Sequence, residues 1–336
     1  MAGILILWRY TMNEDENRQD EGIICELYIR NFDDECSICG QSLEEDEVYY
    51  EPGSDDPLCY DCYNERTRDR AIRDYSYKPE PVFYGEGTRF FGVELEIDEG
   101  GELNKNAQAI LRVANRNADH AYCKHDGSLD DGFEIVTHPM TLDYQLHTMP
   151  WADVVKEAAI LGYTSHQART CGLHIHVNRD CFGEYREEQE AAIARVLYFF
   201  EKHWEELLKF SRRTPRQLDR WAARYGYHDD PKKILDTAKK SYGHAGRYTC
   251  VNLTNDDTVE FRIFRGTLKL NTLIATLQFI DRICDVAICL NDEELTAMPW
   301  TTFVSGTDAV RYPELIQYLK ERRLYVNDVV ETGGEI

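Results

Sequence analysis

Apolar and polar residues alternate strictly along residues 90–98, which predicts a β-strand. Val93, Leu95 and Ile97 fall on one side of it, and acidic residues fall on the other. Similar short runs predict further strands at 132–137, 171–178, 247–253 and 258–265. Apolar residues at helical spacing predict helices at 106–117, 151–162, 187–210, 271–290 and 313–322. Strands joined by hairpins and long helical excursions favour an α+β fold, with a largely antiparallel sheet and helices on one face.

Composition and charge argue against a nucleic-acid-binding protein, a membrane-spanning protein and a secreted disulfide-rich protein. The 336 residues include 38 Lys plus Arg and 61 Asp plus Glu, a formal net charge of −23. A field of that sign repels phosphate backbones, so nucleic-acid binding through a basic surface is not expected. We find no apolar run near the roughly 20 residues that span a bilayer. Eleven cysteines, an odd number, do not suggest a secreted disulfide framework, and we expect a reducing cytoplasm.

Four of the cysteines form two C-x2-C knuckles, with 19 residues between them. They are Cys36, Cys39, Cys59 and Cys62. Zinc prefers four thiolates in a tetrahedron, and a module this small has too little core to fold without a metal. We expect a closed, structural zinc site in a module similar to treble-clef or zinc-ribbon domains. The alternative is four free thiols.

These features predict five segments along the chain. They are a flexible acidic segment at 1–32, the zinc module at 33–75 with a helix at 64–75, a linker at 76–88, a large domain at 89–330 and a tail at 331–336. The linker boundary rests on Pro79 and Pro81, which stiffen an extended chain. No glycine-rich dinucleotide or P-loop motif is present in the sequence, so a parallel Rossmann sheet is not expected.

The polar faces of the predicted strands carry the candidate chemistry. Most of these residues stand in i, i+2 pairs, which places both members of a pair on one sheet face. They are Glu94 and Glu96, Glu134 with Asp126 shortly before it, His174 and His176, and Glu260 and Arg262. Crowded carboxylates need cations, and this donor set suits Mg²⁺ or Mn²⁺ better than zinc. Arg262 is then placed to hold a phosphate. A cupin-like iron site also uses His-x-His, but it needs neither the Glu-x-Glu nor the Glu-x-Arg strand.

The order of these motifs resembles the glutamine synthetase-like carboxylate–amine ligases. The closest resemblance is to their amidoligase branch, which is related to glutamate–cysteine ligase and common in bacterial and phage genomes. The residues that carry it are 91–96, 124–128 with 134–137, 171–177 and 259–262, within a match over about 89–290. The resemblance implies an ATP-dependent enzyme that joins a carboxylate to an amine through an acyl phosphate, releasing ADP and phosphate.

The resemblance also implies residue roles. Glu94, His174 and Glu260 would hold the metal that bridges the ATP phosphates, and Glu96 and Glu134 the metal near the acceptor carboxylate, with Asp126 as a further ligand. Arg262 would stabilise the transferred phosphoryl group, and Arg262, Glu134 and His176 are the expected catalytic residues. His176 and Lys124 would lie close to nucleotide or phosphate, and Arg247 and Arg265 are candidate anion binders by position. Thr258 replaces a basic residue of glutamine synthetases, and no ammonia-site flap is recognisable.

The expected substrates are a carboxylate-bearing small molecule, peptide or protein and an amine donor, with free ammonia disfavoured by the missing flap. The zinc module is a candidate surface for a protein partner, and no membrane partner is expected. Two alternatives remain open at this point. One is a metal-dependent phosphohydrolase that uses the same ions, and the other is a non-catalytic protein that interacts through its zinc module.

Overall fold

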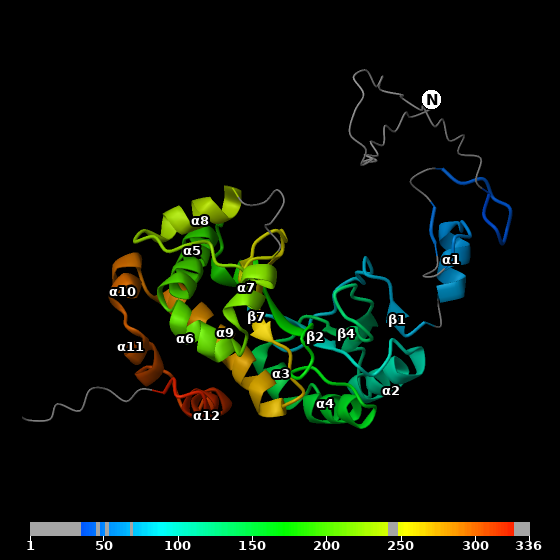
Figure 1. Ribbon diagram of the computed structural model, residues 1–336. Helices are drawn as coiled ribbons and strands as arrows, with labels where there is room; N and C mark the ends of the chain where they lie inside the picture. The colour runs from blue at the N-terminus through cyan, green and yellow to red at the C-terminus, as the bar shows by residue number, and fades with distance from the viewer. Residues whose placement is uncertain (1–34, 45–47, 51–53, 68–69, 241–247, 326–336) are drawn as a thin grey trace, which may run out of the picture. The chain divides into compact units, whose positions relative to one another are not determined.

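The computed structural model describes residues 35–44, 48–50, 54–67, 70–240 and 248–325 (Figure 1). The chain divides into two compact units, Met1–Asp69 and Arg70–Ile336, which we call the cysteine unit and the large unit. The predicted segments 1–32 and 331–336 lie outside the described residues. Among the helices that the structure describes, none is long and apolar enough to cross a membrane.

The cysteine unit is small and has a correspondingly small core. Its one described helix, α1, spans Tyr60–Thr67 and begins within the second knuckle. Two isolated antiparallel bridges, Glu35 with Ser42 and Tyr49 with Leu58, hold the chain around the knuckles. The buried core consists of Cys36, Leu43, Leu58 and Cys59. Since two of these four residues are predicted zinc ligands, little apolar surface remains to stabilise the unit without a metal.

The large unit is built on a seven-stranded sheet in the order β1-β3-β4-β2-β5-β7-β6. The strands are β1 (Ile72–Arg73), β2 (Phe91–Ile97), β3 (Ala121–Lys124), β4 (Phe133–Thr137), β5 (Gly172–Asn178), β6 (Val251–Asn252) and β7 (Thr258–Arg265). All neighbours are antiparallel except β1 and β3, which are parallel. The predicted α+β class and the largely antiparallel sheet are therefore confirmed.

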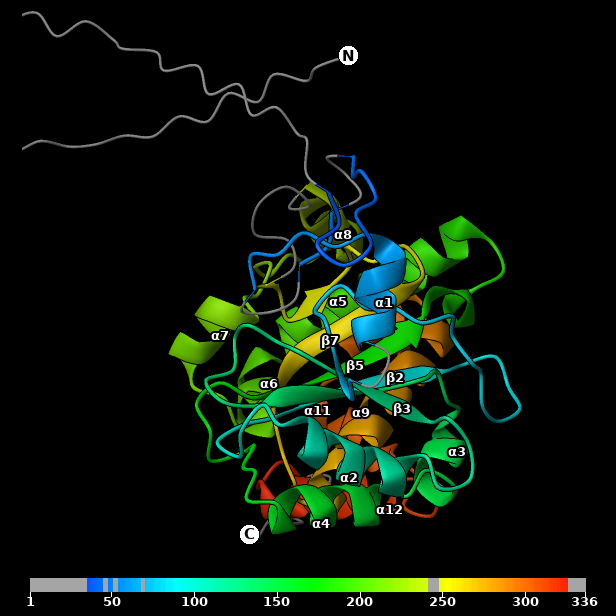
Figure 2. The same ribbon diagram turned by 90° about the vertical axis from the view of Figure 1, so that its right-hand side faces the viewer.

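Helices cover the apolar face of this sheet. Figure 2 shows α2, α4, α9 and α12 stacked beneath the strands. The Phe261 ring on β7 packs against Phe200 on α5, with ring centroids 5.6 Å apart. The helices of the large unit are α2 (Asn104–Ala114), α3 (Leu142–His147), α4 (Trp151–Ile160), α5 (Arg186–Lys202), α6 (Trp204–Ser211), α7 (Pro215–Trp221), α8 (Pro231–Lys240), α9 (Leu270–Cys289), α10 (Asp292–Ala297), α11 (Trp300–Ser305) and α12 (Pro313–Glu321), with a 3₁₀ turn at Arg179–Phe182.

The long helix predicted at 187–210 is broken in the structure. It consists of α5 and α6, which meet at His203, where ψ is 31° and the helical path changes direction. The His203 ring packs against Phe199 and Trp300, with centroids 4.8 and 5.7 Å away. The apolar stripe continues across the break because both helices pack on the same core, so the sequence pattern alone does not reveal it.

The boundary between the units also differs from the prediction. The sequence places the end of the zinc module at 75 and a linker at 76–88, whereas the units divide after Asp69. Strand β1 pairs with β3, and the Tyr84 backbone exchanges hydrogen bonds with Pro139 and Thr141. The proline-stiffened chain therefore lies along the large unit, where an extended segment finds backbone partners, instead of crossing solvent.

Candidate active site

The polar residues of five strands meet on one face of the sheet, opposite the face that carries Val93, Leu95 and Ile97. The strand register pairs Glu94 with His174 and Glu96 with Glu134 across β2. It also pairs Lys124 with Glu134, and His176 with Glu260. Because side chains of paired residues point to the same side of a sheet, all seven lie on one face. The structure thus brings together residues that are far apart in the sequence.

Glu94, His176 and Glu260 form the tightest group on this face. Their ligand atoms all lie within 4.8 Å of one another, a spacing that can hold a metal ion. His176 Nε2 lies 3.2 Å from a Glu94 oxygen and 4.0 Å from a Glu260 oxygen. The other ring nitrogen, Nδ1, lies 3.1 Å from the Thr258 hydroxyl. This contact orients the ring, as outer partners of metal-binding histidines do. Thr258, which stands where glutamine synthetases have a basic residue, therefore has a structural role here.

His174 lies between three carboxylates of the same face. Its Nδ1 is 3.2 Å from Glu94 and 3.8 Å from Glu260, and its Nε2 is 3.5 Å from Glu96. The expected nucleotide-side set of Glu94, His174 and Glu260 is therefore close together. His176, expected near the phosphates, approaches the two glutamates about as closely, so both imidazoles are placed to serve as ligands.

Glu134 and Lys124 form a buried ion pair beside this cluster. Lys124 Nζ lies 3.0 Å from a Glu134 oxygen, and both residues are buried. Burial raises the pKa of Glu134 to about 8, and the charge of Glu94 adds to the effect, while Lys124 opposes it. The charge of Asp126 also raises this pKa, so Asp126 is near enough to matter. Asp126 itself accepts a hydrogen bond from the Ser128 amide at 2.6 Å, which fixes the loop after β3.

Arg262 pairs with Glu260 on β7 at a β-bulge. Ile175 pairs with Phe261 and Leu173 with Phe264, so two residues of β7, Arg262 and Ile263, oppose one residue of β5. Such bulges redirect side chains and are frequent beside active sites. The guanidinium of Arg262 hydrogen-bonds a Glu260 oxygen, and the other Glu260 oxygen accepts from the Asn252 amide at 2.7 Å.

Two further candidates were expected to bind anions. Arg265 lies on the same face of β7 as Arg262 beyond the bulge, where it pairs with Gly172. Arg247 lies outside the described residues.

The charge state of the cluster follows from these contacts. Burial would raise the pKa of Glu94, but the charge of His176 and hydrogen bonds from both histidines hold it well below its usual value. Burial would lower the pKa of His176, yet the charge of Glu94 raises it to about 9. Neutral pH therefore favours an ionised carboxylate beside an imidazolium. The imidazolium supplies the positive charge that a divalent cation would supply when bound.

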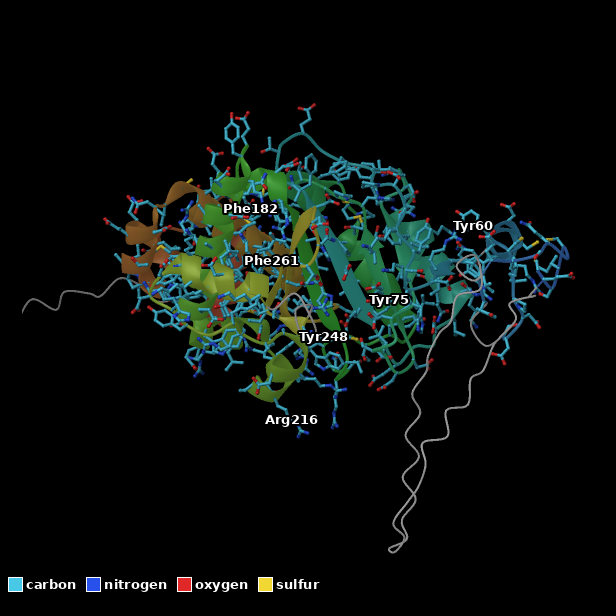
Figure 3. The ribbon with its side chains drawn as sticks, turned by 90° about the horizontal axis from the view of Figure 1, so that it is seen from above. Tyr60, Tyr75, Phe182, Arg216, Tyr248 and Phe261 are labelled. Atoms are coloured by element: carbon cyan, nitrogen blue, oxygen red, sulfur yellow. The ribbon has the colours of Figure 1, made fainter. Side chains whose placement is uncertain are left out.

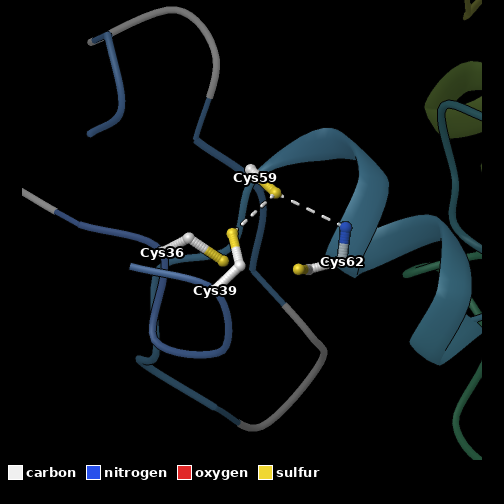
Figure 4. Close-up of side chains that lie close together, drawn as sticks. All are labelled: Cys36, Cys39, Cys59 and Cys62. Carbon is white, nitrogen blue, oxygen red and sulfur yellow. Dashed lines mark hydrogen bonds between the residues drawn. The ribbon is translucent and has the colours of Figure 1, made fainter. Parts of the chain in front are cut away.

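The cysteine unit holds the second possible metal site. The sulfurs of Cys36, Cys39, Cys59 and Cys62 lie within 4.8 Å of one another, and those of Cys39 and Cys59 are 3.7 Å apart (Figure 4). Gly40 has φ of +72°, a conformation that favours glycine, and its amide donates to the Cys36 carbonyl at 2.8 Å. A hydrogen bond from the Cys39 amide is the main cause that lowers the pKa of Cys36 to about 6. Four sulfurs at this spacing could hold one metal ion, and four protein ligands are the number that a closed tetrahedral zinc site uses.

Comparison with known families gives a match within the large unit. A family model described as "putative amidoligase enzyme" matches residues 112–284, which is more than half of the chain. The chain therefore belongs to this family of amide-bond-forming ligases. The match includes Lys124, Glu134, both histidines, Glu260 and Arg262, and it begins after β2, which carries Glu94 and Glu96. In a comparison with curated proteins, no match was found.

Some residues at the site carry no sequence signal that would single them out. Asn252 reaches Glu260 from the edge strand β6, and Tyr122 lies on the polar face beside Lys124. Tyr77 and Tyr75 come from the segment predicted as module end and linker. The Tyr77 ring packs on Tyr122 at 5.4 Å, and Lys124 Nζ lies 5.4 Å above the Tyr75 ring. Figure 3, which looks onto the sheet, shows Tyr75 beside its strands. Tyr75, Tyr77 and Tyr122 thus line one side of the site, and we call them the aromatic wall.

Proposed function

We propose that the protein is an ATP-dependent carboxylate–amine ligase that forms an amide or peptide bond through an acyl phosphate. A carboxylate is a poor electrophile, so it is first phosphorylated by ATP, and an amine then displaces phosphate. The products are the amide, ADP and phosphate. The observation that carries the proposal is the convergence of Glu94, His176 and Glu260 with Arg262 on one sheet face, in a chain of the amidoligase family.

The polar face offers donors for two ions. Glu94 and Glu260 with one or both histidines are the proposed nucleotide-side ligands, and Glu96, Glu134 and Asp126 the proposed acceptor-side ligands. Carboxylate and imidazole donors suit Mg²⁺ or Mn²⁺. Bound there, these ions neutralise phosphate charge and orient the transferred group.

The chain's own residues supply the rest of the mechanism. Arg262 stands beside a proposed ligand carboxylate, where it can stabilise the phosphoryl group during transfer. Lys124, held by Glu134, adds a second fixed cation for phosphate oxygens. Thr258 keeps the His176 ring turned toward Glu94 and Glu260. A ligase must also exclude water from its acyl phosphate, and the aromatic wall of Tyr75, Tyr77 and Tyr122 borders the site on the β3 side.

The test separates a ligase from a metal-dependent phosphohydrolase and from a non-catalytic scaffold. Purified protein is incubated with ATP, Mg²⁺ and pools of carboxylic acids, peptides and amines, and products are searched by mass spectrometry for pairs joined with loss of water. A ligase releases phosphate slowly until both partners are present. Robust phosphate release without an amine would favour the hydrolase, and no nucleotide turnover with any pool would favour the scaffold. Both results contradict the proposal.

For the cysteine unit we propose structural zinc and a docking role. The acidic character of the sequence around the knuckles favours a protein partner over a nucleic acid. The ligase chemistry does not need this unit, because the proposed ligands and Arg262 all come from the large unit.

A further inference from the structure

A group of arginines lies where β5 begins and β7 ends, next to the carboxylates of the polar face. Arg213 is buried, with 8% of its surface exposed, and Arg265 is half-buried. Arg213 follows the end of α6, where Arg212 adopts a left-handed φ of +63°. This conformation is unfavourable for a non-glycine residue and is held by the Arg212 guanidinium, which donates to the Arg265 carbonyl at 2.6 Å. The turn directs Arg213 back toward β7.

Gly172 makes room for Arg213 on the polar face. The Arg213 guanidinium donates from Nε and Nη2 to the Phe264 carbonyl, at 3.2 and 3.1 Å. A Cβ on Gly172 would lie 2.7 Å from Arg213 Nη2 and 2.5 Å from His174 Nε2. The guanidinium and the His174 ring therefore meet over this glycine. Since His174 Nε2 is 3.5 Å from Glu96, Arg213 borders the acceptor-side carboxylates.

Among the described residues, neither of these arginines has a close carboxylate partner of the kind that the half-buried Arg89 has. Arg89, for comparison, lies 2.5 Å from Asp281 and 2.7 Å from Asp285. Within the part of the chain that the structure describes, no carboxylate lies within 4 Å of the Arg213 or Arg265 side chain. Arg265 donates from Nη2 to the Ala168 carbonyl at 3.4 Å, and its buried Nε, like that of Arg89, has no hydrogen-bond partner. Burying a guanidinium without an anion is costly. The charge of Glu96 offsets only part of this cost at Arg213, whose pKa burial lowers to about 10, and a ligand anion would supply the close partner that both arginines lack.

We propose that Arg213 and Arg265 bind an oxyanion group of a ligand that occupies the polar face. The chemistry is that of a carboxylate or phosphoryl group, which guanidinium N–H groups bind in pairs. The identity of the anion rests on the proposed function. For a ligase whose acceptor carboxylate is activated near Glu96 and Glu134, the group at Arg213 is a second acidic group of the acceptor. The acceptor is then a dicarboxylic or otherwise doubly anionic molecule rather than a simple monocarboxylic acid.

The test is anion binding by the full chain without ATP or amine. Titration calorimetry at fixed ionic strength measures glutarate, butyrate and inorganic phosphate against wild type, Arg213→Gln and Arg265→Gln. The matched control is Arg216→Gln, an exposed arginine three residues further along, whose side chain points away from the body of the large unit (Figure 3). Far-UV circular dichroism checks that each variant folds. If Arg213→Gln does not fold, because it leaves the Phe264 carbonyl without donors, the half-buried Arg265→Gln carries the test.

We expect wild type to bind glutarate at least tenfold more tightly than butyrate. Arg213→Gln and Arg265→Gln should each lower the affinity for glutarate at least tenfold, while Arg216→Gln should change that affinity less than twofold. Phosphate binding with the same arginine dependence, in the absence of glutarate binding, would support the oxyanion site and assign it to a phosphoryl group. The proposal is overturned if neither anion binds wild type, or if site and control variants behave alike. A protein that binds glutarate through Arg213 but forms no amide would retain this inference and lose the proposed function.

Discussion

Gly172 offers the sharpest test of the site geometry, because two functional side chains meet above it. In Gly172→Ala the new Cβ would lie 2.5 Å from His174 Nε2 and 2.7 Å from Arg213 Nη2, against an ordinary contact of 3.4 Å or more. The overlaps are 3.4 − 2.5 = 0.9 Å and 3.4 − 2.7 = 0.7 Å. Overpacking of this kind costs about 1–3 kcal/mol, and alanine recovers about 0.5–1 kcal/mol over glycine within a strand. We expect a net loss of up to about 2.5 kcal/mol in the free energy of unfolding, with about 1 kcal/mol at the middle of these ranges.

The control is Gly92→Ala on the neighbouring strand and the same face, where the nearest side-chain atom, His176 Cβ, would be 3.5 Å away. This contact is ordinary, so Gly92→Ala should be neutral or stabilising by up to about 1 kcal/mol. Urea unfolding measures both variants, and calorimetric titration with Mn²⁺ measures the site. Displacing His174 should weaken Mn²⁺ binding in Gly172→Ala alone. If Gly172→Ala is as stable as Gly92→Ala and binds Mn²⁺ as tightly as wild type does, then His174 and Arg213 do not meet above Gly172 as described.

Three further predictions follow from the two possible metal sites. Freshly purified protein should contain about one zinc per chain by metal analysis, and Cys36→Ser should lose it while nucleotide binding by the large unit persists. In magnesium-free buffer, His176, whose pKa is raised from 6.5 to about 9, should contribute stability that is complete below pH 6.5 and lost as the pH rises through about 9. At 1.36 kcal/mol per pKa unit this is at most about 3 kcal/mol, and Glu94→Gln should flatten the pH dependence of urea unfolding. Arg262→Ala should keep ATP affinity within a fewfold of wild type but reduce turnover by about 10²-fold or more; an unchanged rate would remove Arg262 from the mechanism.

The sheet and its polar face were predictable because they depend on period-two alternation. Glu94 with Glu96, and His174 with His176, each point to one side of a strand whatever the remainder of the fold does. The antiparallel pairing then brings the two strands into contact, so the shared face follows from local patterns. The predicted nucleotide-side and acceptor-side ligand sets, in contrast, remain predictions, since they rest on a family resemblance and not on the alternation.

Other features depend on contacts between distant residues, which a linear pattern does not contain. Arg213 reaches the site only because α6 ends in a left-handed turn, and an Arg-Arg pair after a helix looks like an ordinary exposed pair in the sequence. The bulge that separates Arg262 from Arg265 appears only in the register between β5 and β7. Strand β3 is four residues long, too short to stand out beside the motif that begins at Lys124.

The pairing of β1 with β3 has a practical consequence for dissecting the protein. A chain shortened to begin at residue 89, where sequence alone would start the catalytic domain, loses β1, the aromatic cover of Tyr75 and Tyr77, and the backbone bonds of Tyr84. Strand β3 then becomes an exposed sheet edge beside Lys124 and Glu134, and such edges invite intermolecular pairing. The residues just before position 89 therefore belong to the edge of the sheet, and a fragment meant to keep this strand pairing has to begin at or before Arg70.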